Sequence, residues 1–186
     1  MKYKMNFTRL EIPEVILCEP KILSDDRGYF SETFRQDKLE KFLGFSVNFC
    51  QENESKSTFG VLRGLHYQLA PYAQTKLVRV LQGAVLDVSV DLRKDSPTFG
   101  KHVAIELSEE NKKQILIPRG FAHGFAVLSK EAVLAYKVDN YYHQISERGI
   151  ACDDKSFAIN WKLNSEDMKV YLKDANQELF KNADLF

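Results

Sequence analysis

The sequence predicts a mostly β protein, a sandwich or small barrel with helices only at its margins. Between residues 44 and 164, apolar and polar residues alternate mostly with a period of two, as in strands that bury one face. The runs are short, and turns containing glycine, proline or asparagine separate them. Many short strands with few helices are typical of these two architectures. No repeat, low-complexity tract or linker divides the chain, so we expect a single domain over residues 1–186.

The elements outside this region are a turn and two helices. Residues 25–28, of sequence DDRG, predict a polar turn. The stretch from Gln36 to Leu43 carries three apolar residues at helical spacing and stops at Gly44, which predicts a helix. Residues 165–180 have a weaker helical pattern, and we expect a second helix there, added after the core is complete.

The strands of the central region follow one another closely. Gln82-Gly83 separates a strand at 77–81 from the next strand, which predicts a β-hairpin. In that next strand, one face carries Leu86, Val88, Val90 and Leu92, and the other carries Asp87, Ser89 and Asp91. Further strands are expected at 103–107, 114–117, 122–128 and 133–138, with a turn at 118–120.

Composition and charge exclude several functions. Lys+Arg and Asp+Glu are both 26, so no net field draws in nucleic acid or an anionic membrane, and an anionic ligand must be held by a local cluster. Residues 1–10 lack the apolar core of a signal peptide, and no apolar run is long enough to span a bilayer. The three cysteines are widely spaced, without a CxxC pair, and we expect structural thiols in a reducing cytoplasm.

The most informative segment is RGLHYQ at residues 63–68. Arg63 can bind a phosphate with paired hydrogen bonds, and His66 can act as a base near neutral pH. Three positions apart in an extended strand, the two side chains would point to opposite faces. Gly64 between them would allow a bulge that turns both toward one cavity. The alternative is an ordinary turn at the entry of a strand.

The histidines do not form a metal-binding motif. Metal sites in β-barrels usually draw on clustered ligands, often HxH, but Gln68 stands two positions after His66. His102, His123 and His143 are isolated in the sequence, so we expect no metal. His123 lies in an apolar setting, where a core histidine and a ligand contact are equally open.

Two other polar groups interrupt apolar strands. Lys76 opens one strand and Asp87 lies on the next, so the two can pair across the predicted hairpin. The pair is either a routine cross-strand ion pair or an ammonium oriented to stabilise an oxyanion. Tyr136 places a phenol near the last strand, where packing and acid catalysis are both open.

Taken together, the motifs closely resemble the dTDP-4-dehydrorhamnose 3,5-epimerase family, a metal-independent branch of the cupin superfamily. The segments that carry the resemblance run in family order along nearly the whole chain: DRGYFSE at 26–32, RGLHYQ at 63–68, DLRKDSPTFG at 91–100 and IPRGFAHGF at 117–125. It implies a cupin-type jelly-roll barrel that acts as a homodimer. It also implies inversion of C3 and C5 of a dTDP-4-keto-6-deoxyglucose, without cofactor, for dTDP-rhamnose and cell-surface polysaccharide synthesis.

The resemblance also implies residue roles. His66 would remove the proton beside the ketone, oriented by Asp174, and Lys76 would stabilise the enolate oxygen. Tyr136 would return a proton from the opposite face. The remaining implied residues bind the nucleotide diphosphate, the sugar or the thymine: Arg27, Glu32, Gln51, Glu52, Asn53, Arg63, His123, Tyr142, Glu147 and Lys173.

Physical chemistry supports the implied catalytic set independently. A proton next to a carbonyl is removable at neutral pH only if a fixed donor meets the enolate charge. Inversion needs a base and an acid on opposite faces of the carbon, because a single residue would return the proton where it came from. His66, Lys76 and Tyr136 supply these three groups.

Other functions remain open at this point. Within the family, relatives that invert only C3 or that move the keto group between C3 and C4 share these motifs. A metal-dependent cupin oxygenase belongs to a different class, and the missing HxH argues against it. A non-catalytic sugar-nucleotide binding module is a third possibility, but binding alone needs no acid–base pair.

Overall fold

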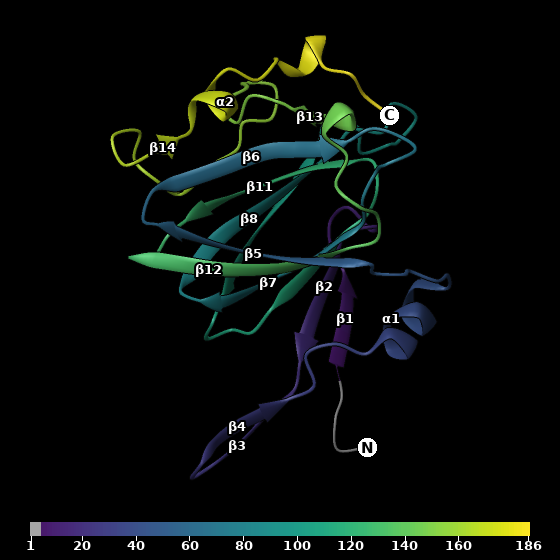
Figure 1. The fold of residues 1–186 in the computed structure, drawn as a ribbon, viewed down its shortest axis with the longest axis vertical. Coiled ribbons are helices and arrows are strands. Elements are labelled where there is room, and N and C mark those ends of the chain that lie inside the picture. Colours follow the sequence, from purple (N-terminus) through teal and green to yellow (C-terminus); the bar gives the residue numbers. More distant parts are fainter. Residues whose placement is uncertain (1–4) are drawn as a thin grey trace.

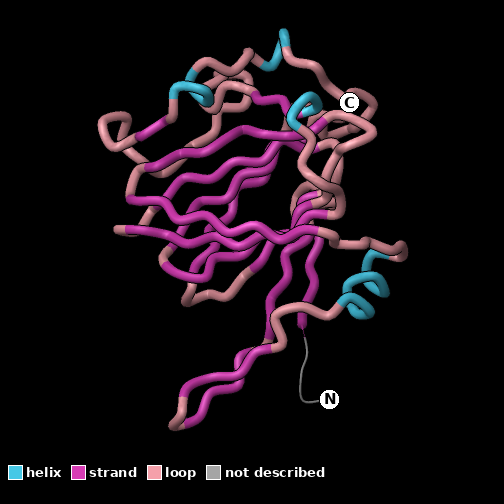
Figure 2. Tube along the Cα trace, viewed as in Figure 1, coloured by secondary structure: helices cyan, strands magenta, loops and turns pink. Residues whose placement is uncertain are grey.

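The computed structural model describes residues 5–186, so residues 1–4 of the start considered above lie outside the described residues. Most of the strands form two sheets that face each other (Figures 1 and 2). The first sheet has the strand order β1 (Met5–Arg9), β2 (Ile16–Pro20), β10 (Gln114–Ile117), β7 (Lys76–Gln82), β12 (Glu131–Val138) and β5 (Gln51–Thr58). The second has the order β13 (Glu147–Gly149), β6 (Val61–Gln68), β11 (Phe121–Val127), β8 (Ala84–Asp91) and β9 (His102–Ser108).

Three apolar clusters hold these layers together. One lies between the two sheets and includes Val78, Val85, Phe125 and Leu134, each at most 6% exposed. A second covers the outer face of the second sheet, where side chains of β6 and β8 pack against residues 150–186. A third lies under the helix on the first sheet. The mostly β fold and the cupin-type barrel expected from the sequence are confirmed.

The predicted hairpin at Gln82-Gly83 is wrong. β7 pairs with β10 and β12 in the first sheet, whereas β8 pairs with β11 and β9 in the second. The two residues therefore carry the chain from one sheet to the other. A period of two shows which side chains share a face but not which strand lies alongside, so a corner and a hairpin look alike in the sequence.

The first predicted helix is confirmed, and the second is wrong. α1 (Gln36–Leu43) ends at Gly44, whose φ of 84° closes the helix, and it buries Leu39. In residues 165–180 only α2 (Leu172–Ala175) is helical. The preceding β14 (Lys169–Val170) pairs with β6, because the apolar side chains of this segment pack on the second sheet in extended form. A 3₁₀ turn, η2, follows at Phe180–Asn182.

A hairpin of β3 (Ile22–Asp25) and β4 (Gly28–Ser31) confirms the predicted turn at residues 25–28. It extends away from the two sheets (Figure 1). Across residues 5–186, the chain has no helix that is both long enough and apolar enough to cross a membrane.

A bulge in β6 confirms the role expected for Gly64. His66 lies opposite His123 of β11, and Arg63 lies opposite Phe125, so three steps on β6 match two steps on β11. The extra residue brings Arg63 and His66 to the same face. Gly64 has a φ of 114° and approaches Gly124 so closely that it has no room for a side chain.

We predict that Gly64→Ala destabilises the protein by about 3 kcal/mol or more, because it adds a steric clash to an unfavourable φ. The added Cβ would lie 2.6 Å from the Gly124 Cα and 2.7 Å from the His123 carbonyl oxygen. Gly44 is a matched control, because its φ is 84° but nothing lies within 4 Å of the added Cβ. Gly44→Ala should cost only about 1–2 kcal/mol in urea unfolding. Equal losses would show that the approach to Gly124 does not matter.

Candidate active site

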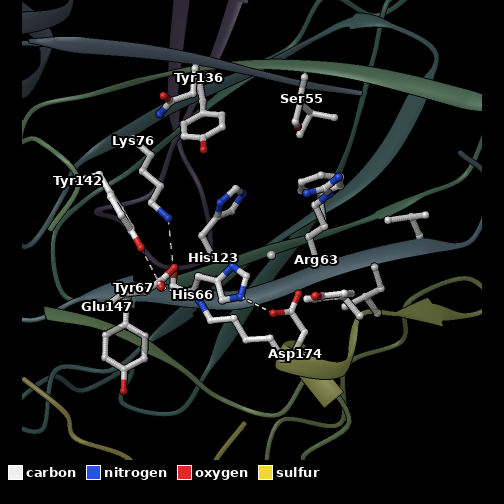
Figure 3. A pocket seen from close by; sticks show the side chains of 18 of the residues that line it. Ser55, Arg63, His66, Tyr67, Lys76, His123, Tyr136, Tyr142, Glu147 and Asp174 are labelled. Atoms are coloured by element: carbon white, nitrogen blue, oxygen red, sulfur yellow. Dashed lines mark hydrogen bonds and ion pairs between the residues drawn. The ribbon is translucent and has the colours of Figure 1, made fainter. Parts of the chain in front are cut away.

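A cavity of about 1030 Å³ opens between the two sheets, and the segment that bears α2 borders it. Its wall on the first sheet comes from β5, β7 and β12, and its wall on the second comes from β6 and β11. Figure 3 shows polar side chains from both walls converging on the same space. β6, β7, β11 and β12 each place a polar residue among apolar ones on these walls, and β5, which is polar throughout, adds Gln51 and Asn53.

On the second sheet, His66 and Asp174 form a close pair. The His66 Nε2 lies 2.7 Å from Asp174 Oδ1, and the Gly64 amide of the bulge donates to Asp174 Oδ2 at 3.2 Å. Burial alone would raise the pKa of Asp174, but the hydrogen bonds from His66 and Gly64 lower it overall. Asp174 therefore remains a carboxylate, fixes the ring, and leaves the other ring nitrogen for the cavity.

Lys76 projects into the cavity from the start of β7. Its Nζ donates to the His66 carbonyl oxygen at 3.5 Å. Burial lowers the pKa of Lys76 to about 8, against the opposing charges of Asp87 and Glu147. Lys76 is thus an ammonium at neutral pH, but one that water does not fully solvate and that can turn its charge toward a ligand oxygen.

Tyr136 faces His66 from the opposite sheet. It lies on β12, opposite Asn53 of β5, and its phenol points toward the middle of the cavity (Figure 3). Burial raises the pKa of Tyr136, so the phenol keeps its proton at neutral pH. The cavity thus has a histidine–carboxylate pair on one wall and a protonated phenol on the other.

A polar network lies beside these groups. Glu147 accepts from the Tyr142 hydroxyl at 3.2 Å and from Lys173 Nζ at 2.5 Å. Burial alone would raise the pKa of Glu147, but the bond from Lys173 lowers it overall. Arg63 Nε donates to Ser57 Oγ at 3.1 Å, which leaves the rest of its guanidinium for an anion. These groups can bind a charged, partly aromatic ligand.

Known proteins with similar sequences belong to one enzyme family, whose chemistry fits this arrangement of side chains. The family model described as dTDP-4-dehydrorhamnose 3,5-epimerase matches residues 9–182. The chain belongs to this family. The curated dTDP-4-dehydrorhamnose 3,5-epimerase of Shigella flexneri is 54% identical over 182 residues, which cover 98% of this chain and 99% of the relative.

Solved structures lead to the same family. The dTDP-4-dehydrorhamnose 3,5-epimerase of Elizabethkingia anophelis is 47% identical, with a TM-score of 0.93, and the match covers 96% of this chain and 97% of that one. A dTDP-6-deoxy-D-glucose-3,5-epimerase from Legionella pneumophila, in complex with dTDP-4-keto-L-rhamnose, is 48% identical. Its TM-score is 0.93, with 97% of this chain and 95% of that chain covered.

Most site residues expected from the resemblance to this epimerase family line the one cavity. They come from parts of the chain that are far apart in sequence: Gln51, Asn53, Arg63, His66, Lys76, His123, Tyr136, Tyr142, Glu147, Lys173 and Asp174. Asp174 is 108 residues from His66 in the chain, yet the two are in contact.

The other three expected substrate-binding residues, Arg27, Glu32 and Glu52, lie outside this cavity within the chain, so their role stays a prediction. Arg27 is at the tip of the β3–β4 hairpin and pairs with Asp25 at 2.5 Å. Glu32 pairs with Lys38 at 2.5 Å on the outer face of the first sheet. Glu52 is on the same outer face, because it alternates with Gln51 and Asn53 along β5.

The sequence analysis missed one residue behind the cavity wall. Asp87 Oδ2 lies 2.8 Å from His123 Nε2, so His123 is also held by a carboxylate. The sequence carries a signal, since Asp87 interrupts an apolar strand, but it predicts a partner for Lys76 across a hairpin that does not form. Residues 5–186 contain no group of three or more His, Cys, Asp or Glu side chains that could hold a metal ion.

Proposed function

We propose that this protein is an isomerase that inverts C3 and C5 of dTDP-4-keto-6-deoxyglucose, the reaction of a dTDP-4-dehydrorhamnose 3,5-epimerase. The observation that carries the proposal is the opposition of His66 and Tyr136 across the cavity, with Lys76 projecting into it. The Legionella relative, which holds a dTDP-4-keto sugar, supports the substrate class.

The reaction begins with removal of a proton from a carbon beside the C4 ketone. His66 takes this proton while Asp174, 2.7 Å away, holds the ring and meets its growing positive charge. The electron pair of the C–H bond moves into the carbonyl, giving an enolate. Lys76 donates a hydrogen bond to the enolate oxygen, which makes the proton removable near neutral pH.

Reprotonation completes the inversion. Tyr136 gives its phenolic proton to the opposite face of the same carbon, and the ketone re-forms. His66 then loses its proton and Tyr136 regains one, so the enzyme returns to its starting state. C3 and C5 both adjoin C4, so one ketone and one Lys76 serve both inversions.

The experiment that tests the proposal is incubation with dTDP-4-keto-6-deoxyglucose in deuterated water, followed by NMR. We predict deuterium at both C3 and C5 in the wild type. His66→Asn should lower exchange at both carbons at least about 100-fold, since a general base is lost. Binding of dTDP, measured by calorimetry, should survive the substitution. His66 is not the base if the variant keeps more than a few per cent of the exchange rate.

The other candidate functions give different results in the same experiment. Label at C3 alone would indicate a 3-epimerase, and movement of the ketone would indicate a 3,4-ketoisomerase. No label with intact dTDP binding would indicate a binding module. A rate lost on chelation and restored by one divalent ion would indicate metal-dependent chemistry.

We predict that Tyr136→Phe separates proton removal from inversion. The variant should still wash deuterium into the sugar, because His66 and Lys76 remain, but it should form much less inverted product. Phenylalanine keeps the ring, so the packing of β12 is preserved and the hydroxyl is the main loss. The ratio of exchange to epimerised product in one reaction is the measurement. If both fall equally, Tyr136 positions the substrate rather than protonating it.

We also propose that the protein is a homodimer in which the β3–β4 hairpin of one copy reaches the cavity of the other. The hairpin extends from the sheets, and Tyr29 and Phe30 on it are 59% and 56% exposed. Arg27 at its tip would then meet the diphosphate of the partner's substrate, which accounts for its distance from its own cavity. Glu32 at the base of the hairpin would bind the substrate in the same arrangement.

Subunit mixing tests this arrangement. We predict that Arg27→Glu and His66→Asn each abolish most activity, and that refolding the two together restores about a quarter of the wild-type rate. Random pairing of equal amounts makes half of all dimers mixed, with one substitution in each subunit, and one of the two cavities in a mixed dimer is intact. No recovery in dimers verified by light scattering would place Arg27 in its own subunit's site or outside it.

A further inference from the structure

Three polar residues of β8 face the space between the sheets, and two of them, Asp87 and Ser89, have a buried oxygen without a hydrogen-bond partner. Asp87, Ser89 and Asp91 have no exposed surface. Asp91 accepts hydrogen bonds from Arg93, Ser96 and Thr98. Asp87 in contrast has only His123, and its Oδ1 has no hydrogen-bond partner. An unpaired carboxylate oxygen in a dry interior is unfavourable, so an uncompensated Asp87 would weaken the fold.

Asp87 is close to the reacting centre through His123. Ser89, His123 and His66 are direct neighbours in one row across β8, β11 and β6. Side chains in such a row are about 5 Å apart at Cβ. The ring that Asp87 holds is therefore next to the proposed base, and its tilt shapes the cavity wall at that point.

The same row connects Asp87 to Lys76, because Lys76 Nζ donates to the carbonyl oxygen of His66, the neighbour of His123. Among the described residues, the Lys76 side chain makes no ion pair, and this long bond is its one hydrogen bond. The charged groups that favour its ammonium form are Asp87 first and Glu147 second. Glu147 is already bound by Lys173 at 2.5 Å, whereas Asp87 keeps one oxygen unused. His123 and Tyr136 also face the cavity but carry no negative charge that would compete.

We propose that Asp87 is a positioning residue with two tasks: its Oδ2 orients the His123 ring, and its Oδ1 is the counterion that keeps Lys76 an ammonium. The energetic penalty of the unpaired oxygen is then offset by the charge of Lys76. Asp87 does not touch substrate in this arrangement. It acts on the enolate only through Lys76, and this part of the inference rests on the proposed function.

The pH dependence of the reaction tests this inference. The ammonium of Lys76 is lost as the pH rises through its pKa of about 8, so the exchange rate should fall above that pH. Without the negative charge of Asp87 the ammonium is less favourable, and its proton leaves at lower pH. In Asp87→Asn the alkaline limb of the plot of kcat against pH, where kcat falls, should therefore lie about one pH unit lower.

Two controls make the result specific. Ser89 lies two residues along the same face, and its hydroxyl is as buried and as unpaired as Asp87 Oδ1. Ser89→Ala should leave the alkaline limb of kcat where it is in the wild type. In a Lys76→Arg background the guanidinium stays charged, so adding Asp87→Asn should leave the alkaline limb of kcat unchanged. An unmoved limb in Asp87→Asn alone, or an equal shift in Ser89→Ala, overturns the proposal.

A second measurement needs neither substrate nor a variant of Asp87. The side-chain carboxyl carbon of Asp87 in labelled wild-type protein should show an NMR inflection near pH 8, as Lys76 loses its charge. In Lys76→Gln that inflection should disappear. A flat titration in the wild type overturns the proposal even if Asp87→Asn fails to fold. Because this readout requires no turnover, it separates failure of the inference from failure of the proposed function.

Discussion

The contact between Gly64 of β6 and Gly124 of β11 is the constraint on which the rest of the site depends. The two backbones approach so closely that a Cβ on either glycine would lie within 2.7 Å of the other strand. This approach accommodates the extra residue of β6, turns Arg63 and His66 to one face, and presents the Gly64 amide to Asp174. A regular strand would place His66 and Arg63 on opposite faces, and one of the two would leave the cavity.

The carboxyl-terminal segment depends on the same bulge. Residues 169–170 pair with the start of β6, and Asp174 then accepts from both Gly64 and His66. Apolar residues that follow, including Phe180 and Phe186, pack on the outer face of the second sheet. The histidine–carboxylate pair is therefore assembled by tertiary packing, and Asp174 depends on that packing for its contact with the base.

The sequence predicts which side chains share the cavity face better than it predicts which strands pair with each other. The period of two and the glycine at position 64 are local properties, so the strands, the bulge and the shared face of Arg63 and His66 follow from them. The partner of each strand is not a local property, which is why the sequence predicts a hairpin where the chain crosses from one sheet to the other. Residues 165–180 looked helical because their apolar residues have mixed spacing, and contact with β6 decided between helix and extended chain. Asp174 was found through the family resemblance, and Asp87 was missed as the partner of His123 because that pairing depends on the register of β8 with β11.

Two requirements on Lys76 oppose each other, and the arrangement of charges around it reconciles them. A lysine exposed to water keeps its proton easily but offers a screened charge to an enolate oxygen. A lysine buried among apolar groups offers a strong charge but loses its proton, and burial lowers the pKa of Lys76 to about 8. Fixed carboxylates near the ammonium preserve the charge without exposing it to water.

These carboxylates must also stay out of hydrogen-bonding range, because a tight ion pair would compete with the enolate for the same donors. Lys76 has no ion-pair partner within 4.0 Å among residues 5–186, while the charges of Asp87 and Glu147 still favour its protonated form. Because this electrostatic support acts without a direct contact, the donors of Lys76 remain available to the reacting oxygen.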